Sequence, residues 1–420
     1  MSNEILYIAH YFAPYSFTPA IRAVQIAKRL KEHGYKIHVI NVKNDKLYPK
    51  DYRTLREVKS PLINIVNISY FTFPFRALEY VLKKISTKFD FFMPSFILHW
   101  IPHSFLRIRK LIKKNNIKVI YTTAPPYFSL FLGYLLKKAF HIPLVIEYRD
   151  PWTFNPYTIN NTSKLYKKLF GSLERRIIKN SDAVLTVSEA MNGFLLKYFP
   201  EVIAEEKITV ISSGLNLDEA SKYTAFKGSQ NEIRFTFTGF LYGMRDITPL
   251  IRIVADVKKK DLFPDIKFRI NIFGKYDYHY LSETIEKNQV EDIFHLGGYI
   301  SHEECYNELS SSTFPLHVGE NLDYPTISFK VWEYLAMRKK IVYLGREDSF
   351  TAQFLQQHDL GFTIPINDHV AGVMRFIELI EGIKSDTLDL EVSSDQLKEF
   401  TWDRIVDKLD RVFQEVIKRT

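Results

Sequence analysis

The sequence predicts an α/β protein made of two successive units, each with a parallel β-sheet covered by helices on both faces. First, 420 residues exceed the roughly 100–200 residues of one domain. Second, short apolar runs alternate with helical patterns through both halves of the chain, which is typical of parallel sheets. Third, a hydrophobic share of 46% and a charged share of 25% lie near globular averages, which excludes a disordered or fibrous chain.

In the first half, the strand Ile5–His10 leads through a loop into a helix at Ala20–His33, where apolar residues recur near every 3.6 positions. Gly34 follows as the helix stop. Further strands are expected at Lys36–Val42, Ile63–Ser69, Lys118–Thr122, Leu144–Tyr148, Ala183–Val187 and Ile208–Ile211, and further helices at Tyr127–Phe140 and Lys164–Asn180.

A polar stretch without periodicity, Ser212–Asn231, predicts the boundary between the two units. The alternation then restarts. Strands are expected at Arg234–Thr238, Lys267–Phe273, Phe294–Leu296, Phe314–Val318, Ile341–Leu344 and Phe362–Ile364, and helices at Pro249–Lys260, Ser328–Met337, Val370–Glu381 and Asp395–Lys418.

Composition and charge indicate in which compartment the protein works and what kind of partner it binds. The single cysteine, Cys305, excludes an internal disulfide and indicates a reducing compartment. The first residues lack the basic start of a signal peptide, and no run reaches the roughly 18–20 apolar residues of a membrane span. The net charge of +9 favours an anionic partner, which could be a nucleotide phosphate, a nucleic acid or a membrane surface.

Most of the surplus charge lies in Val81–Val119, which has nine basic residues, one acid and six Phe or Trp residues. Rings and cations together suit a bilayer interface, so this segment is predicted to contact the membrane. The alternative is a helix pair with an aromatic core face and a solvated basic face. The residues predicted to contact the membrane are Trp100, Arg107, Arg109, Lys110, Lys113 and Lys114.

Several common catalytic signatures are missing from the sequence. It has no G-x-x-x-x-G-K-[ST] phosphate loop, no G-x-G-x-x-G after the first strand, no H-E-x-x-H and no G-x-S-x-G. Hydride transfer, P-loop hydrolysis, zinc proteolysis and serine hydrolysis therefore lose their sequence support. No D-x-D occurs in a strand-end loop, so no metal and no further cofactor is expected. A binding-only pair of α/β domains stays open.

Candidate site residues lie in loops that follow strands, where open α/β sheets bind ligands. In the first half, Arg22 lies in the first turn of a helix whose free N–H groups can meet an anion. Arg149, Asp150 and Trp152 follow another strand, and an Arg–Asp pair there can orient sugar hydroxyls. A structural ion pair is the alternative.

In the second half, Gly239 and Gly243 allow a tight loop that brings Arg245 toward a phosphate. Thr326 or Ser328 can cap the next helix. Its N–H groups and Lys330 then face a diphosphate, while Glu333, one turn later, can accept both hydroxyls of a ribose. An ordinary turn and a surface Lys–Glu pair are the alternatives.

With these motifs the chain resembles a family-4 glycosyltransferase, most closely the enzymes that build surface glycans, over nearly its whole length. The resemblance rests on motifs in the family's order: Tyr11–Pro14 with Arg22 and Gly34, Arg149–Trp152, Ser181–Ser188, Gly239 to Arg245, Ser328–Ala336 and Phe400–Trp402.

The resemblance implies two Rossmann-like domains facing across a cleft (GT-B). It implies an acceptor domain at 1–212, a nucleotide-sugar domain at 213–400 and a C-terminal helix at 401–420 that packs back toward the first domain. It further implies metal-independent transfer with retention. Glu333 matches the second glutamate of the family's E-x₇-E, Arg245 and Lys330 fall near its phosphate-binding pair, and Asp150 faces the donor sugar. Asp150, Arg245 and Lys330 are thus the expected catalytic residues, Gly239, Thr326, Ser328 and Glu333 further donor contacts, and Arg22, Arg149 and Trp152 acceptor contacts.

The chain departs from the family pattern at Pro325, which stands where the first glutamate of E-x₇-E would be, so sugar recognition is expected to differ. The predicted function is transfer of a sugar from a UDP- or GDP-sugar to a lipid-linked glycan acceptor, in the cytoplasm and peripheral to the inner membrane face. The rivals are a nucleotide-sugar 2-epimerase and a nucleic-acid-binding protein. No nucleic acid is expected as partner, because no known nucleic-acid-binding pattern is found.

Overall fold

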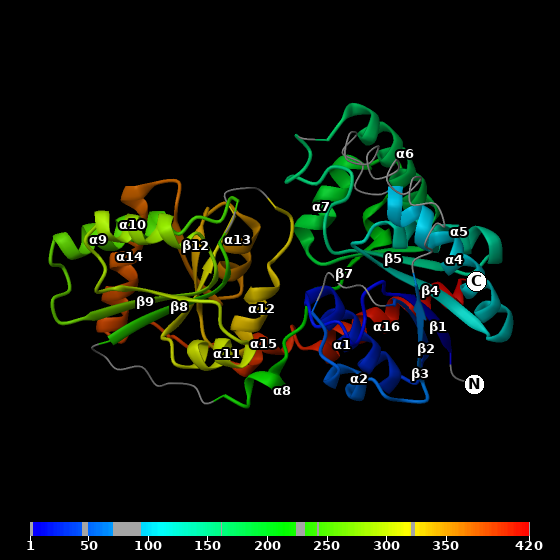
Figure 1. Ribbon diagram of the computed structural model, residues 1–420, viewed down its shortest axis with the longest axis horizontal. Helices are drawn as coiled ribbons and strands as arrows, with labels where there is room; N and C mark the ends of the chain where they lie inside the picture. The colour runs from blue at the N-terminus through cyan, green and yellow to red at the C-terminus, as the bar shows by residue number, and fades with distance from the viewer. Residues whose placement is uncertain are drawn as a thin grey trace. The chain divides into compact units, whose positions relative to one another are not determined.

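The computed structural model describes residues 3–43, 49–69, 94–160, 162–223, 232–241, 243–320 and 324–419. The chain divides into two compact units, Met1–Ser213 together with Trp402–Thr420, and Gly214–Thr401. We call them unit 1 and unit 2. Each holds one parallel β-sheet with helices on both faces, which confirms the predicted α/β fold class (Figure 1). None of the helices in the described part of the chain is long and apolar enough to cross a membrane.

The sheet of unit 1 has seven strands in the order β3-β2-β1-β4-β5-β6-β7. The central strands β1, β4 and β5 are almost wholly buried, because both of their faces are covered. The strands are β1 Glu4–Ile8, β2 Lys36–Val42, β3 Ile63–Ile68, β4 Ile117–Ala124, β5 Leu144–Tyr148, β6 Ala183–Thr186 and β7 Ile208–Val210.

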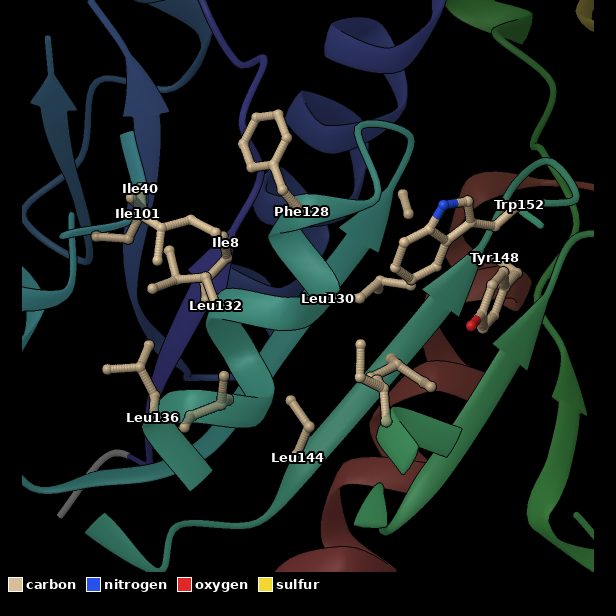
Figure 2. Packing of buried hydrophobic residues seen from close by; sticks show 14 of the residues in the cluster. Ile8, Ile40, Ile101, Phe128, Leu130, Leu132, Leu136, Leu144, Tyr148 and Trp152 are labelled. Carbon is tan, nitrogen blue, oxygen red and sulfur yellow. The ribbon is translucent and has the colours of Figure 1, made fainter. Parts of the chain in front are cut away.

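One face of this sheet packs against three helices, α4 Pro94–Lys114, α5 Phe128–Phe140 and α6 Lys164–Asn180. Alternate strand residues such as Ile8 and Ile146 point to this face and meet side chains from α5. Figure 2 shows Phe128, Leu132 and Leu136 of α5 lying over the strands. Shorter helices complete the unit: α2 Arg53–Glu57, α7 Glu189–Tyr198 and the 3₁₀ turn η1 Glu205–Lys207.

The opposite face packs against α1 Thr18–Glu32 and the last helix of the chain, α16 Trp402–Lys418. Helix α1 ends where Gly34 adopts a positive φ of 82°. The apolar stripe of α16 is buried in the same core as Ile5 and Tyr7 of β1. Polar ties reinforce the contact, because Arg29 lies 2.9 Å from a carboxylate oxygen of Asp403 and the Tyr35 hydroxyl donates to Asp410 at 2.5 Å.

The structure corrects the expectation that Trp100 contacts a membrane. Trp100 belongs to α4, and its side chain is fully buried in the core of unit 1. Its ring packs edge-on against His10 and Phe128. The indole N–H points to the carbonyl of Ile68 at 3.4 Å. Trp100 therefore anchors α4 to the sheet and offers no surface to lipid. The predicted segment also includes residues 81–93, which lie outside the described residues.

The sheet of unit 2 has six strands in the order β10-β9-β8-β11-β12-β13. They are β8 Glu232–Phe240, β9 Lys267–Lys275, β10 Phe294–Gly298, β11 Phe314–Val318, β12 Ile341–Gly345 and β13 Gly361–Pro365. The first strand of the unit, β8, lies in the interior of the sheet. Strands β9 and β10 are added on one side of it, and β11, β12 and β13 on the other. The carboxyl end of β8 is thus the point of topological switch, where open α/β sheets bind ligands.

The helices of unit 2 form two layers on its sheet. On one face of the sheet, residues of β8, β9 and β11 form a hydrophobic core with α9 and α14. On the opposite face, a second core includes α12 and α13. The helices are α8 Leu217–Ala220, α9 Thr248–Lys259, α10 Tyr278–Lys287, α11 His302–Ser310, α12 Phe329–Ala336, α13 Phe350–Gln357, α14 His369–Lys384 and α15 Ser394–Lys398.

Candidate functional site

In unit 2, the loop between β8 and α9 carries Arg245 to the carboxyl end of the sheet. Its guanidinium forms an ion pair with Glu320, with Nη2 2.7 Å and Nε 3.2 Å from the same carboxylate oxygen. Glu320 follows β11, the neighbour of β8 in the sheet. Both side chains keep partial exposure, so the pair lies at the surface of the unit.

The start of α12 supplies the second cation of this site. Ser328 caps the helix, with its hydroxyl oxygen accepting from the Lys330 N–H at 3.4 Å. The Lys330 ammonium lies 2.7 Å from Glu333, which is mostly buried and also lies 3.8 Å from His302. Burial alone would raise the pKa of Glu333, but the Lys330 charge and hydrogen bonds from His302 and Lys330 lower it. Glu333 is therefore held as a carboxylate.

The charges of both cations affect the side chain of His317. This side chain of β11 is buried, and its pKa falls to about 3 through burial and then through the charges of Arg245 and Lys330. A neutral imidazole beneath two cations adds no positive charge of its own. Arg245 lies in the loop after β8 and Lys330 in the first turn of α12, and because both charges affect the same ring of β11, the two cations lie near one edge of the sheet. Two convergent cations at a strand-end edge suit an anionic group.

The backbone around these cations is fixed by close packing. The Tyr334 hydroxyl of α12 accepts from the Thr238 N–H and donates to the Thr238 carbonyl, both at 3.1 Å. Gly239, one residue further, has a φ of +154°, and a Cβ on Gly274 of β9 would meet its carbonyl oxygen at 1.8 Å. The end of β8 is thus tied to α12 and β9 before the loop reaches Arg245.

A depression of about 360 Å³ lies beside this edge, at the carboxyl ends of β8, β9 and β10. Four aromatic side chains line it: Phe240, Tyr276, Tyr278 and Tyr299. Tyr299 is 81% exposed, and three residues later His302 approaches Glu333. The aromatic depression and the charged edge are therefore joined by one short loop. The remaining predicted donor residue, Thr326, is half-buried just before the cap of α12.

In unit 1, Arg22 is buried beneath the carboxyl edge of the sheet. Its guanidinium pairs with Glu147 at 2.5 Å and donates to the carbonyls of Ile211 and Ser212 at 2.6 and 2.7 Å. It also lies 5.8 Å from the Trp402 ring. Burial alone would raise the pKa of Glu147, but the Arg22 charge, hydrogen bonds from Arg22 and Thr123 and the Arg149 charge together lower it. Arg22 therefore cross-links β5, β7 and α16 inside the unit, and its burial leaves little surface for an acceptor.

Arg149, Asp150 and Trp152 follow β5 as expected; Arg149 and Asp150 are both partly exposed, whereas Trp152 is buried. Arg149 is half-buried, and its guanidinium donates to the carbonyls of Ala124 and Pro125. Trp152 is 3% exposed and stacks on Tyr127 with 5.2 Å between ring centroids. Asp150 stays half-exposed at the strand end. After burial, the charge of Asp150 is the largest influence that raises the Tyr127 pKa.

Glu174 of α6 supports this loop from below. The side chain is 1% exposed, and its carboxylate accepts the Thr153 N–H at 3.1 Å. Burial raises its pKa to about 7, although hydrogen bonds from Thr153 partly oppose the rise. The sequence places Glu174 among basic residues of an amphipathic helix, where a surface carboxylate would be expected.

Sequence reasoning missed five residues that shape these two edges: Glu147, Glu174, His302, His317 and Glu320. Two of them had a usable signal, because Glu147 lies at the end of a predicted strand just before the Arg149–Trp152 motif and Glu320 lies two residues after an apolar strand. His302 contacts Glu333 across 31 positions, which no local pattern reveals. Within the described ranges, no group of three or more His, Cys, Asp or Glu residues could hold a metal ion.

Comparisons with known proteins agree with this architecture. A family model described as Glycosyltransferase Family 4 matches residues 20–219. Sucrose-phosphate synthase from Thermosynechococcus elongatus superposes with a TM-score of 0.65 at 14% identity, covering 100% of both chains. TarM (TM-score 0.63, 12% identity) and apo WaaB, a lipopolysaccharide outer core galactosyltransferase (0.61, 11%), each cover 98% of this chain and 99% of their own. No curated protein sequence matches the chain significantly.

Proposed function

We propose that the chain is a glycosyltransferase that moves a sugar from a nucleotide-diphosphate sugar to a lipid-linked glycan acceptor. Its two parallel α/β units and the match of residues 20–219 to the Glycosyltransferase Family 4 model support the proposal. In this proposal unit 2 binds the donor and unit 1 binds the acceptor. Transfer proceeds with retention and without a metal ion.

The observation that carries the proposal is the pair of preorganised cations at the carboxyl end of the sheet, where Glu320 holds Arg245 and Glu333 holds Lys330. These two cations would hold the diphosphate, and the N-terminal N–H groups of α12 would add further donors. Glu333, kept ionised by Lys330, would accept the two ribose hydroxyls. The aromatic depression at β8 to β10 has flat apolar walls and a volume that suits a nucleobase.

The chemistry follows from where charge develops. As the bond to the sugar breaks, negative charge grows on the leaving diphosphate, and preorganised cations stabilise that charge more than they stabilise the substrate. Arg245 and Lys330 are held in place by Glu320 and Glu333 before any ligand binds. The leaving phosphate oxygen can itself take the proton of the acceptor hydroxyl, so no separate base is required. Asp150, at the strand end of unit 1, would orient the sugar, with Arg149 and Trp152 holding the loop on which it lies.

A lipid-linked acceptor fits the exposed basic residues of α4. Arg107, Arg109, Lys110, Lys113 and Lys114 are all exposed on this helix. Cations near an anionic bilayer each contribute about 1 kcal/mol to attraction. A protein held there would meet an acceptor that stays in the membrane, which supports a peripheral location at the inner face.

The test is incubation with a panel of UDP- and GDP-sugars and lipid-linked acceptors, with detection of released nucleotide diphosphate. Release that depends on the acceptor supports transfer, and NMR of the product then reports the anomeric configuration. Conversion of the donor without any acceptor would indicate a 2-epimerase instead. Lys330→Met should lower turnover on the order of a hundredfold. Lys287→Met, which removes an exposed lysine of α10, should leave turnover unchanged.

A further inference from the structure

The two helical faces of unit 1 differ strongly in charge. Helices α4, α5 and α6 together carry thirteen Lys or Arg residues and one acid, counted over residues 94–114, 128–140 and 164–180, all described by the structure. That acid is Glu174, which is buried. The opposite helices, α1 and α16, carry eight basic and five acidic residues within their bounds. Figure 1 shows α4, α5 and α6 on one side of the sheet of unit 1, with α1 and α16 on the other.

Neighbouring carboxylates neutralise little of this charge. Lys137 pairs with Asp182 at 2.5 Å, and Arg175 pairs with Glu201. The other eleven basic residues form no ion pair that the described residues show. The layer formed by α4, α5 and α6 therefore presents a positively charged surface, which is complementary to an anionic bilayer.

Helix α6 adds exposed apolar side chains to this surface. Leu165 and Leu169 are 53% and 51% exposed and lie one turn apart. Lys164 and Lys168 lie next to them and are also exposed. On α4, Leu106 is 57% exposed beside Arg107. Exposed leucines flanked by lysines on a helix are typical of an element that lies in the membrane interface with its apolar side chains below the headgroups.

We infer that the outer face of α4, α5 and α6 lies flat on an anionic membrane, and that Leu165 and Leu169 of α6 insert below the headgroups as an apolar anchor. We call Leu165, Leu169, Lys164 and Lys168 the α6 anchor. The inference rests on the proposed function in one respect, because a lipid-linked acceptor would lie in the same bilayer. The inference goes beyond the proposed function in two respects. It assigns membrane contact to α6, which lies outside the basic segment Val81–Val119, and it specifies which face of unit 1 contacts the lipid.

The test is flotation of the full-length protein with phosphatidylglycerol-containing vesicles and with pure phosphatidylcholine vesicles. The wild type should float with the anionic vesicles only. Leu165→Asn/Leu169→Asn should lower the partition coefficient on the order of tenfold, because two half-exposed leucines lose their transfer to an apolar environment. Lys164→Gln/Lys168→Gln should also weaken binding, and this loss should shrink at high salt.

A matched control exists in unit 2, where Val370 and Met374 are 68% and 56% exposed one turn apart on α14. Val370→Asn/Met374→Asn should float like the wild type. Equal flotation of the α6 leucine variant and the wild type would overturn the inference. So would retention on duplex DNA without vesicle binding, since the surface would then serve a nucleic acid.

Nucleotide binding separates this inference from the proposed function. Every α6 variant should bind UDP or GDP with wild-type affinity and should turn over a soluble acceptor analogue normally. Normal turnover together with unchanged flotation would reject the α6 anchor alone. Loss of turnover by the wild type on every donor, with flotation as expected, would reject the proposed transfer and leave the membrane contact standing.

Discussion

Replacing Glu174 by glutamine should remove a pH dependence from the stability of unit 1. The carboxyl group is buried beneath the loop that carries Asp150, and its nearest backbone donor is the Thr153 N–H at 3.1 Å. Glutamine keeps an oxygen that can accept this hydrogen bond and has nearly the same volume. The substitution therefore changes the ionisation at this position and little else.

The magnitude follows from the pKa. Folding raises the pKa of Glu174 from its ordinary 4.5 to about 7, because burial disfavours the charged form. The folded state then holds a proton that the unfolded state releases between these two values. Stability is therefore full below about pH 4.5 and falls as the pH rises toward 7. The total loss is on the order of 3 kcal/mol.

The assay is urea unfolding of the wild type and Glu174→Gln at a series of pH values from 4.5 to 8. Tryptophan fluorescence reports mainly on unit 1, which holds Trp100, Trp152 and Trp402. The difference in unfolding free energy should grow in favour of the variant as the pH rises. Glu206→Gln, at an exposed position, should show no such divergence. Curves for Glu174→Gln and the wild type that stay parallel across the series would refute the raised pKa.

Three further outcomes are expected for the donor site. Glu333→Ala should weaken UDP or GDP binding roughly tenfold in calorimetry, because the ribose loses its acceptor, while exposed Glu381→Ala serves as control. Unchanged affinity for every nucleotide would argue against this placement of the ribose. Glu320→Gln should weaken pyrophosphate binding roughly two- to fivefold, since Arg245 loses the carboxylate that holds it in place; tighter binding would show that Glu320 competes with the phosphate for Arg245 instead. Turnover should survive a chelator, and loss with EDTA that magnesium restores would contradict a metal-independent mechanism.

The fold was predictable because its strands and helices follow from local patterns of apolar and polar residues in the sequence. Alternation of apolar runs with 3.6-periodic segments located β1 and α1 within two residues at either end of each element. The position of a candidate residue in the fold was predictable only where the residue closely follows a strand, as Arg245 does, or lies within one helix, as Lys330 and Glu333 do. The contact of His302 with Glu333 depends on tertiary packing, which sequence spacing does not encode.

Burial was the property that sequence reasoning judged least well. Trp100 and Arg22 carry chemistry that suits a membrane and an anion, yet both are enclosed by the core of unit 1. The sequence pattern of a tryptophan among lysines is the same whether the ring faces the lipid or the protein core. Only the arrangement of α4 on the sheet decides the direction.

The chain leaves unit 1 at Ser213 and re-enters it at Trp402, so that unit 2 is an insertion within unit 1. The core that covers one face of the first sheet includes Trp402, Leu409 and Phe413 of α16. A ribosome synthesises these residues only after all of unit 2, so unit 1 stays incomplete until unit 2 has been made. Nascent chains should therefore expose the uncovered face of that sheet throughout synthesis of unit 2, and chains that stop before Trp402 should be substrates for chaperones and proteases.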